Sequence, residues 1–318
     1  MIERIVFMGT PDFSIPALNA LSAQYKISAV YTQPDRPVGR GLQLAASPVK
    51  ERALELKIPV YQPEKLTASG EFEKLAALKP DVIVVVAYGQ ILKLNVLALP
   101  RLGCINIHSS LLPRWRGAAP IHWALLEGDA ETGVTTMRMD SGLDTGDILL
   151  QAKTKIQSDE KIGPLHDRLS QLGAELIVKT LQELDAGTAN PIKQNTALAT
   201  HASKITKEMG SLNTHEEPAE KLLRRIRALN PWPGTWINIR GVGRLKVLEA
   251  GLRADIQSSA PGQIFERAGM LMLSSTEGSL ELQRLQWEGK KPIGPVEFLN
   301  GLKGRGQTLP LQLDSKPA

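Results

Sequence analysis

The chain has 318 residues, of which 42% are hydrophobic and 22% are charged, and its formal net charge is +5. This is an ordinary globular composition, long enough for two domains, and no apolar run reaches the length of a membrane-spanning helix. The first residues read directly into a strand and lack the layout of a signal peptide. The single cysteine, Cys104, excludes an intramolecular disulfide and a cysteine-built metal site. We therefore expect a soluble protein of the reducing cytoplasm.

The first half of the sequence alternates short apolar runs with amphipathic segments. The apolar runs predict strands at residues 5–8, 27–32, 58–61, 81–87 and 104–108. Helical spacing between them predicts helices at residues 13–22, 49–56, 71–78 and 120–127. The unbroken β-branched run at 81–87 suits a strand covered by helices on both faces. The pattern predicts an α/β fold with a doubly wound, mainly parallel, Rossmann-like sheet.

The remainder of the chain changes character. A long amphipathic segment at 164–187 ends at Gly187, and a polar stretch without clear periodicity follows it. After a cationic helix at 217–229, short strands are predicted at residues 235–240, 244–250, 262–265, 270–273 and 279–287. Closely spaced strands of this kind predict a small, OB-like β-barrel. We expect a catalytic domain at 1–189, a linker at 190–207 and a C-terminal barrel domain at 208–318.

The charge is unevenly divided between these parts. Residues 1–199 hold 21 basic and 21 acidic side chains, whereas residues 200–318 hold 17 basic and 12 acidic ones. A neutral N-terminal part followed by a basic C-terminal third is typical of a chain with a separate module that binds a polyanion. A merely basic domain would have the same excess, so charge alone leaves both interpretations open.

Three polar residues are candidates for catalysis. Asn106 and His108 are two apart at the end of a predicted strand, so both side chains lie on one face. The carboxyl end of a strand is where open α/β sheets bind ligands, and Asp144 could reach this face from a glycine-bracketed loop. An amide donor, a titratable imidazole and a carboxylate suit acyl transfer from a carbonyl to an amine, in which an oxyanion is stabilised and protons are moved.

Each of these residues also has a simpler interpretation. A histidine at a strand end often makes only a structural hydrogen bond, and Asn106 and Asp144 could cap turns. Asp140 and Asp147 could indicate a metal, but no further ligand cluster accompanies them, so we expect no metal. No G-x-S-x-G setting supplies a nucleophilic serine, which favours direct transfer over an acyl-enzyme.

The motifs around these residues resemble the signature of the folate-dependent formyltransferases. Asn-x-His-x-Ser-Leu-Leu-Pro-x-Trp-Arg-Gly begins at Asn106, and Asp-x-Gly-x-Asp-Thr-Gly begins at Asp140. Within this family the chain resembles, over nearly its whole length, the members that formylate methionyl initiator tRNA. The further segments that support the resemblance are 9–13, 32–37, 86–89, 114–121 and 230–233.

The resemblance implies roles for the candidate residues. His108 would handle protons and polarise the formyl group, Asn106 would stabilise the oxyanion, and Asp144 would orient His108. The donor would be 10-formyltetrahydrofolate, a co-substrate, without a metal. The residues that would line its site are Ser110, Leu111, Leu112 and Pro113, with Ile91 and Leu92 as walls for the pterin. Ile91 and Leu92 could equally be ordinary core residues.

The implied acceptor is methionyl initiator tRNA, and the product would serve translation initiation. A loop at residues 33–47 would dock on the acceptor end of the tRNA through Arg36 and Arg40, although its composition is also that of an ordinary surface loop. Further candidates for phosphate contact are Arg224, Arg225 and Lys246, each of which could instead be a solvated surface cation. We expect a monomer with no membrane partner.

Other functions remain open on the sequence. A formyltransferase for glycinamide ribonucleotide or an amino sugar would share the site, but the basic β-rich module argues against a small nucleotide acceptor. A folate-dependent hydrolase would release formate to water. A catalytically silent RNA-binding protein on the same scaffold would have no need of Asn106, His108 and Asp144 together.

Overall fold

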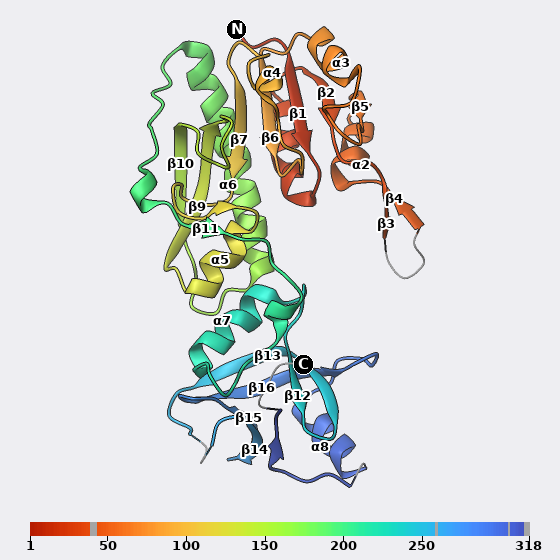
Figure 1. Cartoon of the computed structure of the whole chain (residues 1–318), viewed down its shortest axis with the longest axis vertical. Coiled ribbons are helices and arrows are strands. Elements are labelled where there is room, and N and C mark those ends of the chain that lie inside the picture. The colour runs from red at the N-terminus through yellow and green to blue at the C-terminus, as the bar shows by residue number, and fades with distance from the viewer. Residues whose placement is uncertain (39–42, 258–259, 305, 315–318) are drawn as a thin grey trace. The chain divides into compact units, whose positions relative to one another are not determined.

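The structure is a computed structural model that describes residues 1–38, 43–257, 260–304 and 306–314. The chain forms two compact units (Figure 1). The first unit consists of residues 1–121, 131–155 and 163–203, and the second consists of residues 122–130, 156–162 and 204–318. Two short segments from the first half of the chain thus belong to the second unit, which no sequence pattern indicated.

A seven-stranded sheet forms the centre of the first unit. Its strands are β1 (Ile5–Gly9), β2 (Ile27–Tyr31), β5 (Val60–Tyr61), β6 (Val82–Val86), β7 (Cys104–His108), β9 (Glu131–Arg138) and β10 (Ile148–Lys155). They lie in the order β10-β9-β7-β6-β1-β2-β5, and the five from β7 to β5 are parallel. The predicted doubly wound, mainly parallel sheet is confirmed. Because β1 pairs with β2 on one side and β6 on the other, its carboxyl edge is a topological switch point, where such sheets bind ligands.

Strands β9 and β10 were not predicted from the sequence. They form an antiparallel edge beside β7. Strand β9 is buried from Thr132 to Met137 although four of those six residues are threonine or glycine, so its sequence lacks the usual apolar pattern. The buried hydroxyls are satisfied by hydrogen bonds: Thr136 Oγ1 lies 2.8 Å from Thr180 Oγ1, and Thr135 Oγ1 donates to the Ser110 carbonyl at 2.7 Å.

Helices connect and cover these strands. Their bounds are α1 (Ile15–Ser22), α2 (Pro48–Glu55), α3 (Glu71–Ala77), α4 (Leu94–Leu97) and α6 (Ile162–Ala186), with 3-10 turns at Asp12–Ser14 and Thr196–Leu198. Helix α5 (Pro120–Glu127) begins at the end of this unit, and most of its residues, like the 3-10 turn at Glu208–Gly210, belong to the second unit. Helix α6 lies against the middle of the sheet, where a Cβ on Gly173 would come within 2.9 Å of the Ile107 side chain. Each helix in the described ranges is too short or too polar to cross a bilayer.

Two small pairings complete the first unit. Strands β3 (Arg36–Val38) and β4 (Gln43–Ala45) form an antiparallel hairpin within the segment predicted to be a surface loop. Strands β8 (Arg116–Gly117) and β11 (His201–Ala202) pair in parallel. The second pairing places residues from the predicted linker beside the segment that follows β7.

The second unit is built on a six-stranded antiparallel sheet. Its strands are β12 (Trp236–Ile239), β13 (Gly243–Arg253), β14 (Gln263–Arg267), β15 (Met270–Ser274), β16 (Ser279–Trp287) and β17 (Leu311–Gln312), in the order β12-β13-β16-β15-β14-β17. The two edges meet, because Arg240 N donates to the Gln312 carbonyl at 2.9 Å and Asp314 N donates to the Asn238 carbonyl at 3.0 Å. The sheet therefore closes into the small barrel that the sequence predicted.

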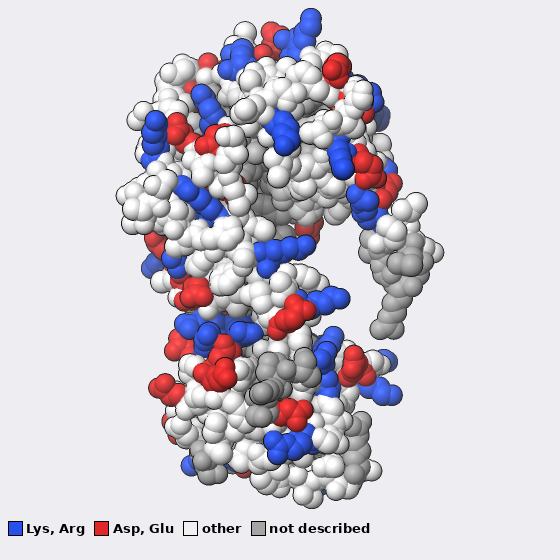
Figure 2. Space-filling view, viewed as in Figure 1, with Lys and Arg blue, Asp and Glu red and all other residues white. Residues whose placement is uncertain are grey.

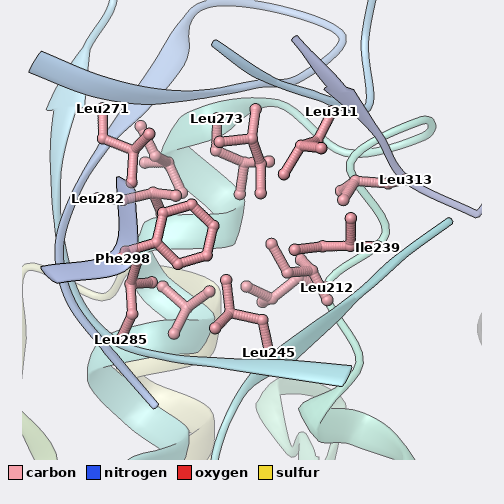
Figure 3. Close-up of a cluster of buried hydrophobic side chains, with 14 of the residues drawn as sticks. Leu212, Ile239, Leu245, Leu271, Leu273, Leu282, Leu285, Phe298, Leu311 and Leu313 are labelled. Atoms are coloured by element: carbon pink, nitrogen blue, oxygen red, sulfur yellow. The ribbon is translucent and has the colours of Figure 1, made fainter. Parts of the chain in front are cut away.

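Helices α7 (Ala219–Leu229) and α8 (Pro295–Lys303) accompany the barrel. Helix α8 was not predicted, because it is short and contains Gly301, but it supplies the largest side chain of the barrel core. Phe298 is fully buried and stacks on Trp287 with ring centroids 5.7 Å apart. Figure 3 shows Phe298 among leucine side chains that come from several strands. The core thus depends on one aromatic residue outside the sheet.

Replacing Phe298 by alanine is expected to destabilise the second unit by about 3–5 kcal/mol, because a cavity remains where the ring was. Denaturant unfolding followed by tryptophan fluorescence measures the loss, since Trp287 reports on the site directly. Val296→Ala on the same helix is the matched control, because Val296 is 69% exposed. Equal unfolding midpoints for the two variants would contradict the assignment of Phe298 to the core.

Candidate active site

Asn106 and His108 lie at the carboxyl end of β7, as predicted. Asn106 is level with Val85 of β6, and His108 is level with Thr135 of β9. Since Ile107 faces α6, strand alternation turns Asn106 and His108 to the opposite face of the sheet. The Asn106 amide is half-buried and makes no hydrogen bond to the described part of the chain. It is therefore available to a bound molecule.

The two ring nitrogens of His108 have different surroundings. Nε2 lies 2.8 Å from the carbonyl oxygen of Trp115. Because a carbonyl can only accept, Nε2 donates its proton to this bond. Nδ1 lies 3.7 Å from Asp144 Oδ2, which is an ion-pair distance and longer than a hydrogen bond. The imidazole is thus held by the backbone through one nitrogen and faces a carboxylate with the other.

Asp144 is held in place by its own loop and by the segment after β7. Its Oδ2 accepts a hydrogen bond from Gly117 N at 2.9 Å. Within the loop, Asp140 Oδ1 accepts from Gly142 N at 3.0 Å and from Thr145 Oγ1 at 2.6 Å. Asp140 therefore shapes the loop that presents Asp144 to His108, a role that its spacing alone did not show.

The four residues predicted to line the folate site after His108 differ in accessibility. Ser110 and Leu112 are buried, whereas Leu111 and Pro113 are half-buried. The Ser110 hydroxyl donates to the Arg114 carbonyl at 2.6 Å, so it braces its own loop. Leu111 and Pro113 are the two of this group that a ligand can reach most readily.

Thr135 is a residue of this site that the sequence analysis missed. Its hydroxyl donates to the Ser110 carbonyl at 2.7 Å and accepts from Leu112 N at 3.1 Å. It also accepts from Gln151 Nε2 at 2.9 Å. One buried hydroxyl thereby fixes the backbone that follows His108. No sequence signal indicates it, because threonine in a strand is commonplace.

The structure separates the two predicted pterin walls. Leu92 is 5% exposed and belongs to the hydrophobic core on one face of the sheet, whereas Ile91 is 82% exposed. Ile91 lines a pocket of about 360 Å³ together with Lys93 and Val96. Of the pair, only Ile91 is placed where a ligand can touch it.

The predicted tRNA contacts in the segment 33–47 are only partly described. Arg36 pairs with Glu64 at 3.0 Å, and both side chains are exposed. Arg40 lies outside the described residues. On the face drawn in Figure 2, Lys and Arg side chains are interspersed with Asp and Glu. A tRNA phosphate that binds Arg36 would have to displace Glu64 from this ion pair. Exposed ion pairs contribute little free energy, so Glu64 is a weak competitor.

Two of the three predicted contacts in the second unit, Arg224 and Arg225, have partners within the chain. Arg225 pairs with Glu217 at 3.2 Å and donates to the carbonyl oxygens of Ser211, at 3.0 Å, and Met209. These bonds give Arg225 a structural role that the sequence analysis did not foresee. Arg224 pairs with Glu220 at 3.3 Å. Lys246, on β13, is half-buried.

Metal ligation finds no support in the described ranges, where no group of three or more His, Cys, Asp and Glu residues converges. Cys104 is buried, and its thiol lies 3.6 Å from the Val96 carbonyl oxygen. Burial raises the pKa of the Cys104 thiol to about 12, so the group stays protonated near neutral pH. Cys104 is a core residue beside the site.

An amide, an imidazole and a carboxylate thus lie together at the carboxyl edge of this sheet, and sequence similarity places the chain among the formyl transferases. Residues 3–181 match the formyl transferase family, and residues 204–303 match the formyl transferase C-terminal domain. The methionyl-tRNA formyltransferase of Halorhodospira halophila is 48% identical over 303 residues, which cover 95% of this chain and 97% of that protein. That of Paracoccus denitrificans is 47% identical over 311 residues, covering 98% and 100%. The chain belongs to the methionyl-tRNA formyltransferase family and is an enzyme.

Solved structures agree on the fold. The N-formyltransferase of Helicobacter canadensis, in complex with folinic acid and dTDP-3-aminofucose, has a TM-score of 0.66 at 19% identity, covering 89% of this chain and 99% of that one. The sugar 3N-formyl transferase WlaRD, solved in the presence of dTDP and 5-N-formyl-THF, has a TM-score of 0.66 at 18% identity, covering 92% and 100%. At these identities the likeness establishes the fold alone.

Proposed function

We propose that the enzyme transfers the formyl group of 10-formyltetrahydrofolate directly to the α-amine of methionine on initiator tRNA. The observation that carries the proposal is the grouping of Asn106, His108 and Asp144, with the Asp144 carboxylate 3.7 Å from Nδ1 of His108. Membership of the methionyl-tRNA formyltransferase family supports the acceptor. We infer the steps of the reaction from the chemistry of the Asn106, His108 and Asp144 side chains.

In the proposed step the amine nitrogen attacks the formyl carbon, and the carbonyl electron pair moves to oxygen. The Asn106 amide donates a hydrogen bond to this oxyanion, which is the charge that develops in the transition state. The attacking amine loses one proton and the departing folate nitrogen gains one, so the reaction needs a group that passes a proton on. Nδ1 of His108 carries that proton, because Nε2 is held by Trp115.

The free α-amine has an ordinary pKa of about 7.7–8.0, so a large neutral fraction exists without deep activation. Positioning of the two substrates and stabilisation of the oxyanion are therefore the main catalytic contributions. Asp144 contributes by fixing the ring of His108 and by holding a proton that arrives at Nδ1. Direct transfer requires no covalent enzyme intermediate.

We propose that the folate donor binds at the same edge of the sheet. Solved relatives of the same fold carry folinic acid or were solved with 5-N-formyl-THF. In this chain the accessible apolar side chains nearest the catalytic strand in sequence are Leu111 and Pro113, and Ile91 follows β6. We propose that these three contact the folate, while Ser110 and Leu112 shape its site from behind.

The acceptor would contact Arg36 and Arg40 in the first unit and Arg224, Arg225 and Lys246 in the second. Of the last three, Arg224 and Lys246 are the stronger candidates, because Arg225 is bound on several sides by its own domain. We further propose that the enzyme acts as a monomer in the cytoplasm, without a metal and without a membrane partner.

The test is formyl transfer from 10-formyltetrahydrofolate to methionyl initiator tRNA, methionyl elongator tRNA and glycinamide ribonucleotide. A strong preference for the initiator species is the expected result. Transfer to glycinamide ribonucleotide would overturn the acceptor, and loss of the donor without any acceptor would indicate a hydrolase.

A further inference from the structure

Residues 194–202 run beside the segment that follows β7, although the sequence reads as a linker. Arg116 N donates to the Thr200 carbonyl at 2.9 Å, and Ala118 N donates to the Ala202 carbonyl at 2.8 Å. Trp115 N donates to Thr200 Oγ1 at 2.9 Å. The segment therefore adds a short parallel strand to the backbone that carries both the Trp115 carbonyl and Gly117 N.

Gln194 lies at the start of this segment and forms hydrogen bonds with both Arg116 and the Asp144 loop. Its Oε1 accepts from Arg116 Nε at 2.9 Å and from Arg116 Nη2 at 2.7 Å. Its Nε2 donates to the Asp144 carbonyl at 2.9 Å and to the Gly146 carbonyl at 2.8 Å. An amide has two acceptor sites and two donor hydrogens, and all four are used. Gln194 thus ties the Asp144 loop to the segment after β7.

The backbone that Gln194 and Thr200 hold is strained. Trp115 has φ 64° and Asp144 has φ 53°, and both lie in the left-handed region that L-residues disfavour. Trp115 supplies the carbonyl that accepts from Nε2 of His108, and Asp144 supplies the carboxylate that faces Nδ1. Trp115 N donates to Thr200 Oγ1, and the Asp144 carbonyl accepts from Gln194 Nε2, so these hydrogen bonds hold the two conformations that the site needs.

We propose that Gln194 is a positioning residue for Asp144, and that residues 194–202 are part of the catalytic apparatus rather than a passive connection. The inference rests on the proposed role of Asp144 in formyl transfer. Gln194 lies between the two matched regions, which end at residue 181 and begin at residue 204. It acts through the placement of Asp144, without touching the reacting atoms.

Gln194→Glu keeps the hydrogen bonds that the side chain accepts from Arg116 and removes those that it donates to the Asp144 loop. One carboxylate oxygen still accepts from Arg116, but the other has no hydrogen to donate and faces the carbonyl oxygens of Asp144 and Gly146. Gln194→Asn is the neutral companion, which keeps the amide but is one methylene too short to bond on both sides. Gln171→Glu, on the exposed part of α6 in the same unit, is the control for the added charge.

The experiment measures kcat, the KM for each substrate and the pH dependence of kcat for these variants, alone and combined with Asp144→Asn. Gln194→Glu and Gln194→Asn are expected to lower kcat by on the order of 10²-fold, because small misplacements of a catalytic group have effects of this size. Both KM values should stay within about twofold, and the pH profile should change as it does in Asp144→Asn. Gln171→Glu should match the unchanged enzyme.

Combination with Asp144→Asn decides whether Gln194 acts through Asp144. In the Asp144→Asn background, Gln194→Asn should lower kcat little further, because the group that it positions is already disabled. Losses that multiply, or a fully active Gln194→Asn beside an impaired Asp144→Asn, would overturn the positioning role and leave the proposed function intact. A fully active Asp144→Asn would overturn the proposed role of Asp144 and this inference with it.

Discussion

Replacing His108 by asparagine is expected to lower kcat by about 10²- to 10⁴-fold, the usual contribution of a positioned acid–base group. The imidazole is 6% exposed and held at Nε2 by the Trp115 carbonyl, so only Nδ1 remains for proton transfer. Asparagine can still donate toward Trp115 but has no group that titrates. Single-turnover formyl transfer, with initiator tRNA and donor in excess of their KM values, measures the effect.

The matched control for this prediction is the same exchange at His166. His166 is partly exposed on α6 and faces Asp12 and Asp167 rather than Asp144. His166→Asn should keep nearly full activity, and tRNA binding should be similar in both variants. Equal losses of turnover and tRNA affinity in His108→Asn would contradict a role confined to chemistry.

Replacing Asn106 by aspartate is expected to lower kcat by about 10²- to 10³-fold, as removal of one oxyanion donor does. The two side chains have nearly the same shape, so packing beside β6 is retained. Aspartate cannot donate, and its charge would repel the negative oxygen that forms in the transition state. The effect belongs in kcat, because the donor carbonyl of the bound substrate carries little charge before attack.

Steady-state kinetics with both substrates tests the Asn106 prediction, and Asn19→Asp on α1 is its control. The Asn19 side chain accepts from Arg52 Nε at 2.7 Å, a bond that aspartate also accepts. Asn19→Asp should therefore behave as the unchanged enzyme. A rise in the KM for the donor with an unchanged kcat would instead assign Asn106 to substrate binding.

The elements with a strong period were predictable from the sequence. The apolar strand at Val82–Val86 and helix α5 (Pro120–Glu127) lie where the pattern placed them, because burial on both faces or on one stripe leaves a clear signature. Strand β9 was not predicted, because its buried threonines form hydrogen bonds with other elements and so do not produce an apolar pattern. Helix α8 was not predicted, because its nine residues include Gly301 and show too weak a helical periodicity.

The placement of the candidate catalytic residues was also predictable, since spacing and motif are local properties. Asn106 and His108 share one strand, and alternation alone puts them on one face. The groups that surround Asn106 and His108 were not predictable from the sequence. The Trp115 carbonyl, the Thr135 hydroxyl and the Gln194 amide act through partners many residues away, and a carbonyl oxygen has no signature in a sequence.

The sequence by itself determined the class of sheet, the barrel and the choice of three candidate catalytic side chains, because each depends on periodicity or on neighbours a few residues apart. The tertiary structure alone decided that residues 194–202 belong beside the catalytic loops, that Arg225 is bound within its own domain, and that Leu92 is core while Ile91 is exposed. These outcomes depend on which distant backbone groups each side chain meets, and that is settled only when the strands and loops are packed together.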